Sequence, residues 1–157
     1  MTRVRRRRRS GRGAVVVEFA LVAPLLLMIV FGIIDFGWMI DRSNVVNNVA
    51  RDAARTASLD GNRATIRTVA TDELADIGVT YPGPNATVTI TCTTPAGVTC
   101  NDSDFDAKAI AGSSVRVTVS YTHHWITPVG ALCSFFGGGS CTGSTIELTR
   151  TSEMVRE

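Results

Sequence analysis

The sequence predicts an α+β fold: a long N-terminal transmembrane helix that continues outside, one short amphipathic helix, and a small antiparallel sheet of three to four strands. Three observations support this prediction. Residues 19–34 carry no charge, and the apolar run continues past Asp35 to Ile40. Residues 64–77 place apolar side chains at helical spacing. Three later segments alternate apolar and polar residues, which is the pattern of half-buried strands.

The first apolar segment is long enough to cross a membrane. A helix needs about 20 apolar residues to span a hydrocarbon core of about 30 Å, and residues 19–40 supply that length. Residues 1–13 precede it with seven arginines and no acidic residue. Basic flanks stay cytoplasmic, so we expect a cytoplasmic leader at 1–13, a transmembrane helix at 14–40, and residues 41–157 outside.

Two helices are expected directly outside the membrane, within residues 41–80. The first continues the membrane helix to residue 59 and carries a narrow apolar stripe of Val46, Val49, Ala50, Ala53 and Ala57. Such a stripe packs either on neighbouring helices or on the chain's own domain, and the pattern leaves both open. The second helix covers residues 64–77, with Asn62 as its N-cap and Gly78 at its end.

Residues 81–157 form the predicted β region. Strands are expected at 87–92, 115–121 and 145–151. In the first two, the inward residues are Val88, Ile90, Cys92, Val115, Val117, Val119 and Tyr121. Ile146 and Leu148 mark the third strand.

All four cysteines, Cys92, Cys100, Cys133 and Cys141, lie in this external part. An even number outside the membrane favours disulfides. Four cysteines allow three connectivities, of which the adjacent pairing 92–100 and 133–141 is the simplest. The spacing does not suit zinc, which favours ligand pairs such as CxxC.

No pattern in the sequence predicts catalysis, a cofactor or a metal site. Asp102, Asp104 and Asp106 have the spacing of a calcium loop, but Ala107 and Ser113 stand where that loop needs glycine and glutamate, so a solvated turn is expected. His123 and His124 point to opposite faces of a strand, and we expect them at the surface or rim. No catalytic or nucleotide-binding motif occurs.

The arginine run does not predict nucleic-acid binding. Without the leader arginines, 9 basic residues face 14 acidic ones, a net charge of −5. Directly before a transmembrane helix, such a run sets topology and contacts anionic lipid.

Glu18 stands at the start of the apolar run, where an ionised carboxylate is costly unless it has a partner or lies at the headgroup boundary. The arginine-rich leader, Gly13, Glu18 and Phe19 together resemble the class III signal of type IV pilin-like proteins. The segment VVVEFALVAPLLLMIVFGIIDFG resembles, more narrowly, the TadE-like pseudopilins of tight-adherence pilus systems, as do ARDAAR at 50–55 and EMVR at 153–156. Ala14 departs from the phenylalanine that many classical type IV pilins carry there.

This resemblance implies cleavage between Gly13 and Ala14 by a prepilin peptidase. Glu18 and Phe19 then become the fifth and sixth mature residues, and Glu18 pairs with the terminal ammonium of a neighbouring subunit. The implied protein is a minor pseudopilin of the cytoplasmic membrane. Its partners are the peptidase, other pilin subunits and the assembly platform, and it is not an enzyme. The alternative is an uncleaved, signal-anchored binding domain unrelated to pili.

Overall fold

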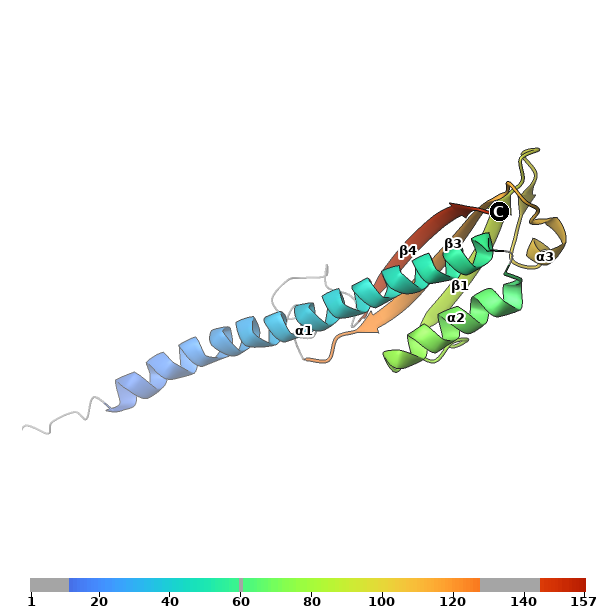
Figure 1. Ribbon diagram of the computed structural model, residues 1–157. Coiled ribbons are helices and arrows are strands. Elements are labelled where there is room, and N and C mark those ends of the chain that lie inside the picture. The colour runs from blue at the N-terminus through green and yellow to red at the C-terminus, as the bar shows by residue number, and fades with distance from the viewer. Residues whose placement is uncertain (1–11, 60, 128–144) are drawn as a thin grey trace, which may run out of the picture.

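A computed structural model describes residues 12–59, 61–127 and 145–157. Its elements are α1 (Arg12–Ser58), α2 (Arg63–Asp76), β1 (Ala86–Thr93), β2 (Thr99–Cys100), α3 (Phe105–Lys108), β3 (Ser114–His124) and β4 (Thr145–Val155). Figure 1 shows α1 as a long rod whose N-terminal half extends away from the sheet, while its C-terminal half lies along the sheet beside α2. The α+β prediction is confirmed.

The helix α1 runs without interruption through the predicted membrane segment and the predicted external stripe. Its N-terminal half is apolar on all sides, and its C-terminal half is apolar on one face. The stripe residues Val46, Val49, Ala50, Ala53 and Ala57 are all buried against the chain's own core. Of the two readings of this stripe, the structure therefore shows packing on the chain's own domain.

The helix α2 lies within one residue of its predicted bounds at both ends. The Asn62 side chain accepts a hydrogen bond from the Thr65 amide at 2.9 Å, which satisfies one of the free N–H groups of the first turn. Gly78 has φ of 71°, a left-handed conformation that glycine adopts without strain, and its N–H bonds to the Ala75 carbonyl. The helix buries Ile66, Ala70 and Leu74.

The sheet is antiparallel with strand order β2-β1-β3-β4. Along β1 the inner residues Ala86, Val88, Ile90 and Cys92 are buried, and the threonines between them face outward. The helix α1 covers β3 and β4, and α2 lies over β1. Both long strands extend beyond their predicted ends, because β3 continues to His124 and β4 to Val155.

One element differs from the sequence-based expectation. Within the stretch expected to form a solvated turn, residues 105–108 form the single helical turn α3, and its first residue, Phe105, is fully buried. A four-residue helix has too few positions to show a helical repeat, so the periodicity of the sequence does not reveal it.

Candidate functional site

The N-terminal half of α1 presents an apolar surface with no covering from the rest of the described chain. The helix α1, from Gly13 to Ser58, is long and apolar enough to cross a membrane. Phe19 and Leu21 are 71% and 74% exposed. Exposure of such an apolar surface to water is unfavourable. In lipid the side chains contact apolar acyl chains, and the helix satisfies its own backbone hydrogen bonds.

The residues of the expected processing site lie at the start of this surface. Gly13 and Ala14 are exposed in the first turn of α1, where the backbone N–H groups have no helical partner. Glu18 and Phe19 follow one turn later, also exposed. Within the described part of the chain, Glu18 takes part in no ion pair or hydrogen bond, so its carboxylate is open to a partner from another molecule.

Asp35 is buried, although an acidic residue at the outer end of a membrane segment would be expected to contact water. It is only 1% exposed. One carboxylate oxygen accepts a hydrogen bond from the Ile126 amide at 3.3 Å, and the other accepts the Thr127 hydroxyl. The partners lie more than 90 residues away in sequence, and no local pattern could reveal this contact.

His123 lies at the same junction between α1 and the end of β3, and it is buried rather than at the surface. Its ring makes an edge contact with Trp125, with centroids 5.9 Å apart. Burial lowers the pKa of His123, and the nearby Asp35 carboxylate opposes this shift only in part. Arg42 and His124 lower the pKa further. His124 is exposed, so the predicted opposite orientation of the two histidines is confirmed.

A second set of titratable groups joins α1 to α2. The pKa of Glu73 is raised from 4.5 to about 7, first by burial and then by the neighbouring Asp52 carboxylate through charge repulsion and a hydrogen bond. Asp76 adds a smaller repulsion. A protonated Glu73 can donate a hydrogen bond to Asp52, whereas two ionised carboxylates repel each other.

This carboxyl pair predicts a stability that falls as pH rises. Because the folded pKa of Glu73 lies above its unfolded value, the folded state binds the proton more tightly, and stability is lost between about pH 4.5 and 7. We expect a loss of about 1–2 kcal/mol after solvent screening. Glu73→Gln should abolish this slope in urea unfolding. Asp72→Asn, at an exposed neighbouring position, should keep it; equal slopes in all three proteins would contradict the prediction.

The calcium-like aspartates instead bind the chain's own groups. Asp102 forms an ion pair with Arg67, and Asp104 pairs with Lys108. Asp106 accepts a hydrogen bond from the Arg63 amide at 2.7 Å, and so supplies a partner for the first turn of α2. The Asp102 and Asp106 contacts tie the α3 region to the start of α2, whereas the Asp104 pair lies within the α3 region.

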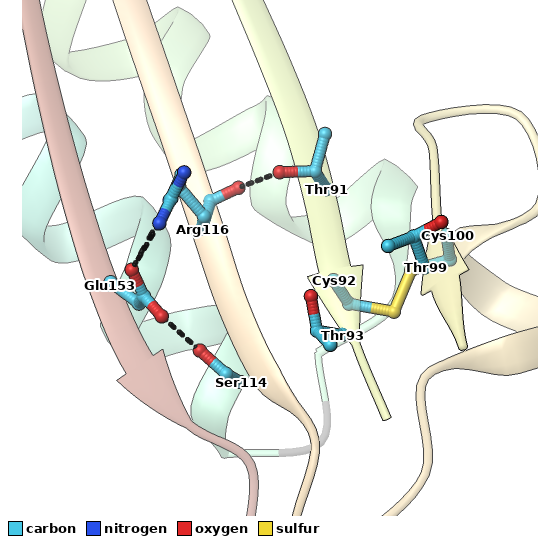
Figure 2. A pocket seen from close by; sticks show the side chains of 8 residues that line it. All are labelled: Thr91, Cys92, Thr93, Thr99, Cys100, Ser114, Arg116 and Glu153. Carbon is cyan, nitrogen blue, oxygen red and sulfur yellow. Dashed lines mark hydrogen bonds and ion pairs between the residues drawn. A yellow bond between two sulfur atoms is a disulfide. The ribbon is translucent and has the colours of Figure 1, made fainter. Parts of the chain in front are cut away.

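A polar hollow of about 270 Å³ opens where the outer face of the sheet meets the β1–β2 hairpin. Figure 2 shows its lining. The Arg116 guanidinium bonds to Glu153 at 2.8 Å, and Glu153 also accepts the Ser114 hydroxyl. The Ser114 hydroxyl, followed by Arg116, lowers the pKa of Glu153. The charges of this hollow satisfy each other, which indicates a structural clamp between β3 and β4.

A disulfide joins Cys92 to Cys100 at the edge of the hollow, with a Cα–Cα distance of 4.9 Å. The two residues are directly opposite each other in the β1–β2 ladder. Cys133 and Cys141 lie outside the described residues, and their pairing stays a prediction. Non-reducing peptide mapping should recover the linked pairs 92–100 and 133–141; crossed pairs or free thiols would contradict this connectivity.

Comparison with known proteins identifies one part of this chain. Residues 13–55 match the family model described as TadE-like protein, which confirms the resemblance seen in the sequence. The match covers Gly13, Glu18, Asp35 and most of the buried stripe, and it ends just before the end of α1. No curated protein and no solved structure matches the chain at a significant level.

Proposed function

From the TadE-like match of residues 13–55, we propose that this chain is a minor pseudopilin of a tight-adherence pilus, without enzymatic activity. A prepilin peptidase removes the leader, α1 holds the subunit in the cytoplasmic membrane, and the domain of residues 41–157 stands outside. The observation that carries the proposal is the position of Gly13 and Glu18 inside the matched segment, with Glu18 free of partners in the described chain.

The charge chemistry of cleavage supports a role for Glu18 in assembly. Cleavage after Gly13 gives Ala14 a free ammonium group. In lipid, an unpaired ammonium or carboxylate is unfavourable, whereas the two groups of neighbouring subunits can neutralise each other. Because Glu18 lies near one end of α1, this pairing sets the register between subunits.

A groove on α1 supports helix packing between subunits. It is lined by Ile29, Gly32, Ile33, Phe36, Gly37 and Ile40. A Cβ atom added at Gly32 or Gly37 would meet no atom within 4 Å, so packing among the described residues requires neither glycine. Glycine in a helix costs about 1 kcal/mol relative to alanine, and small residues let a neighbouring membrane helix approach closely.

The processing step has a direct test. Intact-mass measurement of protein purified from membranes should show the loss of residues 1–13, and Gly13→Asp should block that loss. The first turn of α1 gives no packing reason for glycine, because an added Cβ at Gly13 also meets nothing within 4 Å. A full-length chain from cells with an active peptidase would favour the alternative of an uncleaved, signal-anchored protein.

A further inference from the structure

The contact between Asp35 and the segment after β3 affects how far along α1 the apolar layer of the membrane can extend. A carboxylate in an apolar helix normally marks the water boundary, because it is costly in lipid without partners. Here the Ile126 amide and the Thr127 hydroxyl take the place of water at Asp35. The apolar layer can therefore extend past Asp35 without leaving an unpaired polar group.

The helix surface stays apolar for another turn and a half beyond Asp35. Phe36 and Ile40 are 56% and 47% exposed on the side of the helix that carries the groove. Trp38 is 46% exposed on the opposite side of the helix. The first exposed charge that follows is Asp41. An apolar band, exposed on two opposite sides of the helix, thus lies at this level and is continuous with the predicted membrane surface.

The outer domain contributes to the same band. Ile126, whose amide is bound to Asp35, is 62% exposed, and Trp125 is half-buried beside it. In Figure 1 the segment that follows β3 runs beside α1 near the middle of the rod, where the helix leaves the sheet. We call Trp38, Trp125 and Ile126 the basal patch. It combines side chains from α1 and from the segment after β3.

Helix length places the basal patch at the bilayer surface. At 1.5 Å per residue, a crossing that starts at Ala14 reaches about 30 Å near Ile34, and one that starts at Phe19 does so near Trp38. The two choices place the end of the hydrocarbon layer between about Ile34 and Trp38, which is the level of the Asp35 contact and of the basal patch. Tryptophan is enriched there because its ring is apolar and its N–H can reach polar headgroups.

We infer that the basal patch docks on the lipid interface on the domain's side of the membrane and that Asp35 holds it there. The Arg42 guanidinium lies 5.4 Å from the Trp38 ring centroid, so a cation follows the tryptophan on the water side. A neighbouring protein helix could cover only one side of α1, whereas lipid can contact the whole band. The inference requires the helix to cross a membrane but not a role in pili.

Tryptophan fluorescence tests this inference directly, because the chain has only two tryptophans, Trp38 and Trp125. The full chain and its Trp38→Phe and Trp125→Phe variants are reconstituted at low protein-to-lipid ratio. The vesicles contain phosphatidylcholine and phosphatidylglycerol, with bromine at a shallow or a deep acyl position. We expect the remaining tryptophan of each variant to be quenched more strongly by shallow bromine and to be protected from aqueous acrylamide.

Two results would overturn the docking. Quenching of Trp125 by acrylamide but not by brominated lipid would place the base of the domain in water. Protection of Trp125 from both quenchers would show that protein, not lipid, covers it.

The holding role of Asp35 has its own variants. Asp35→Leu, made in the Trp38→Phe background, removes both acceptors and should shift the docked-to-undocked ratio by about tenfold or more, which increases acrylamide quenching of Trp125. Asp35→Asn keeps one acceptor oxygen and should give a smaller change. Asp41→Asn, an exposed acid on the same helix, is the control. Circular dichroism and the Cys92–Cys100 bond verify folding; unchanged Trp125 quenching in folded Asp35→Leu would exclude the holding role.

Discussion

Glu18→Ala is expected to leave insertion, cleavage and folding intact and to reduce piliation strongly. The substitution removes a charge that lipid disfavours, so the isolated subunit should insert at least as easily. The Glu18 side chain takes part in no ion pair or hydrogen bond within the described chain, so folding loses no such contact when it is removed. In an assembled fibre, however, the ammonium of a neighbouring Ala14 would be left unpaired. Removal of one member of a buried ion pair costs about 3–5 kcal/mol.

The effect should follow the chemistry of the side chain. Glu18→Gln keeps the shape of the side chain and some of its hydrogen bonding, so its piliation should fall between that of the parent chain and that of Glu18→Ala. Asp41→Ala removes an exposed acid from the same helix, beyond the apolar run, and should leave piliation unchanged. The measurement is pilus number by electron microscopy, with immunoblots for processing and membrane level. Normal piliation of Glu18→Ala at normal protein level would assign Glu18 to the headgroup boundary, without a role in assembly.

The sequence predicts the elements of this fold because their physical signals are local. Membrane-length apolarity identifies α1, the Asn62 cap and Gly78 delimit α2, and the alternation of Val115, Val117 and Val119 identifies β3. Each signal lies within a window of one element. The sequence also predicts that the stripe on α1 is buried. It does not predict which surface covers the stripe, because a stripe of small residues has the same pattern whether it packs within or between chains.

The contacts that join elements were not predictable in the same way. Asp35 and Ile126 are 91 residues apart, and nothing near either residue indicates the other. The burial of His123 depends on the side of β3 that faces α1 and on the two aromatic rings beside it. The pairing of Glu73 with Asp52 requires the angle at which α2 crosses α1. These features depend on tertiary geometry, which periodicity does not contain.

Overpacking of the alanine stripe should be strongly destabilising. Ala53 is fully buried where α1 packs against the rest of the core. Ala53→Leu adds three carbon atoms at a position where the helix backbone lies close to its neighbours. Relief requires α1 to move away from the sheet, or its side chains to leave their preferred rotamers. The expected cost is about 2–3 kcal/mol, which corresponds to a fall in Tm of about 5–15 °C for a domain of this size.

Asn48→Leu is the matched control, because it introduces the same side chain at an exposed position five residues earlier on α1. Its effect on stability should stay within about 0.5 kcal/mol. Both variants are compared with the parent chain by thermal unfolding in the same detergent. Unfolding is monitored by far-ultraviolet circular dichroism, which reports on strands and helices. The two interpretations of the stripe, packing on the chain's own sheet or on a neighbouring subunit, predict different Tm values. Packing on the chain's own sheet requires a clear difference between the two variants in the isolated subunit, whereas equal Tm values would show that Ala53 faces open space until a neighbouring subunit covers it.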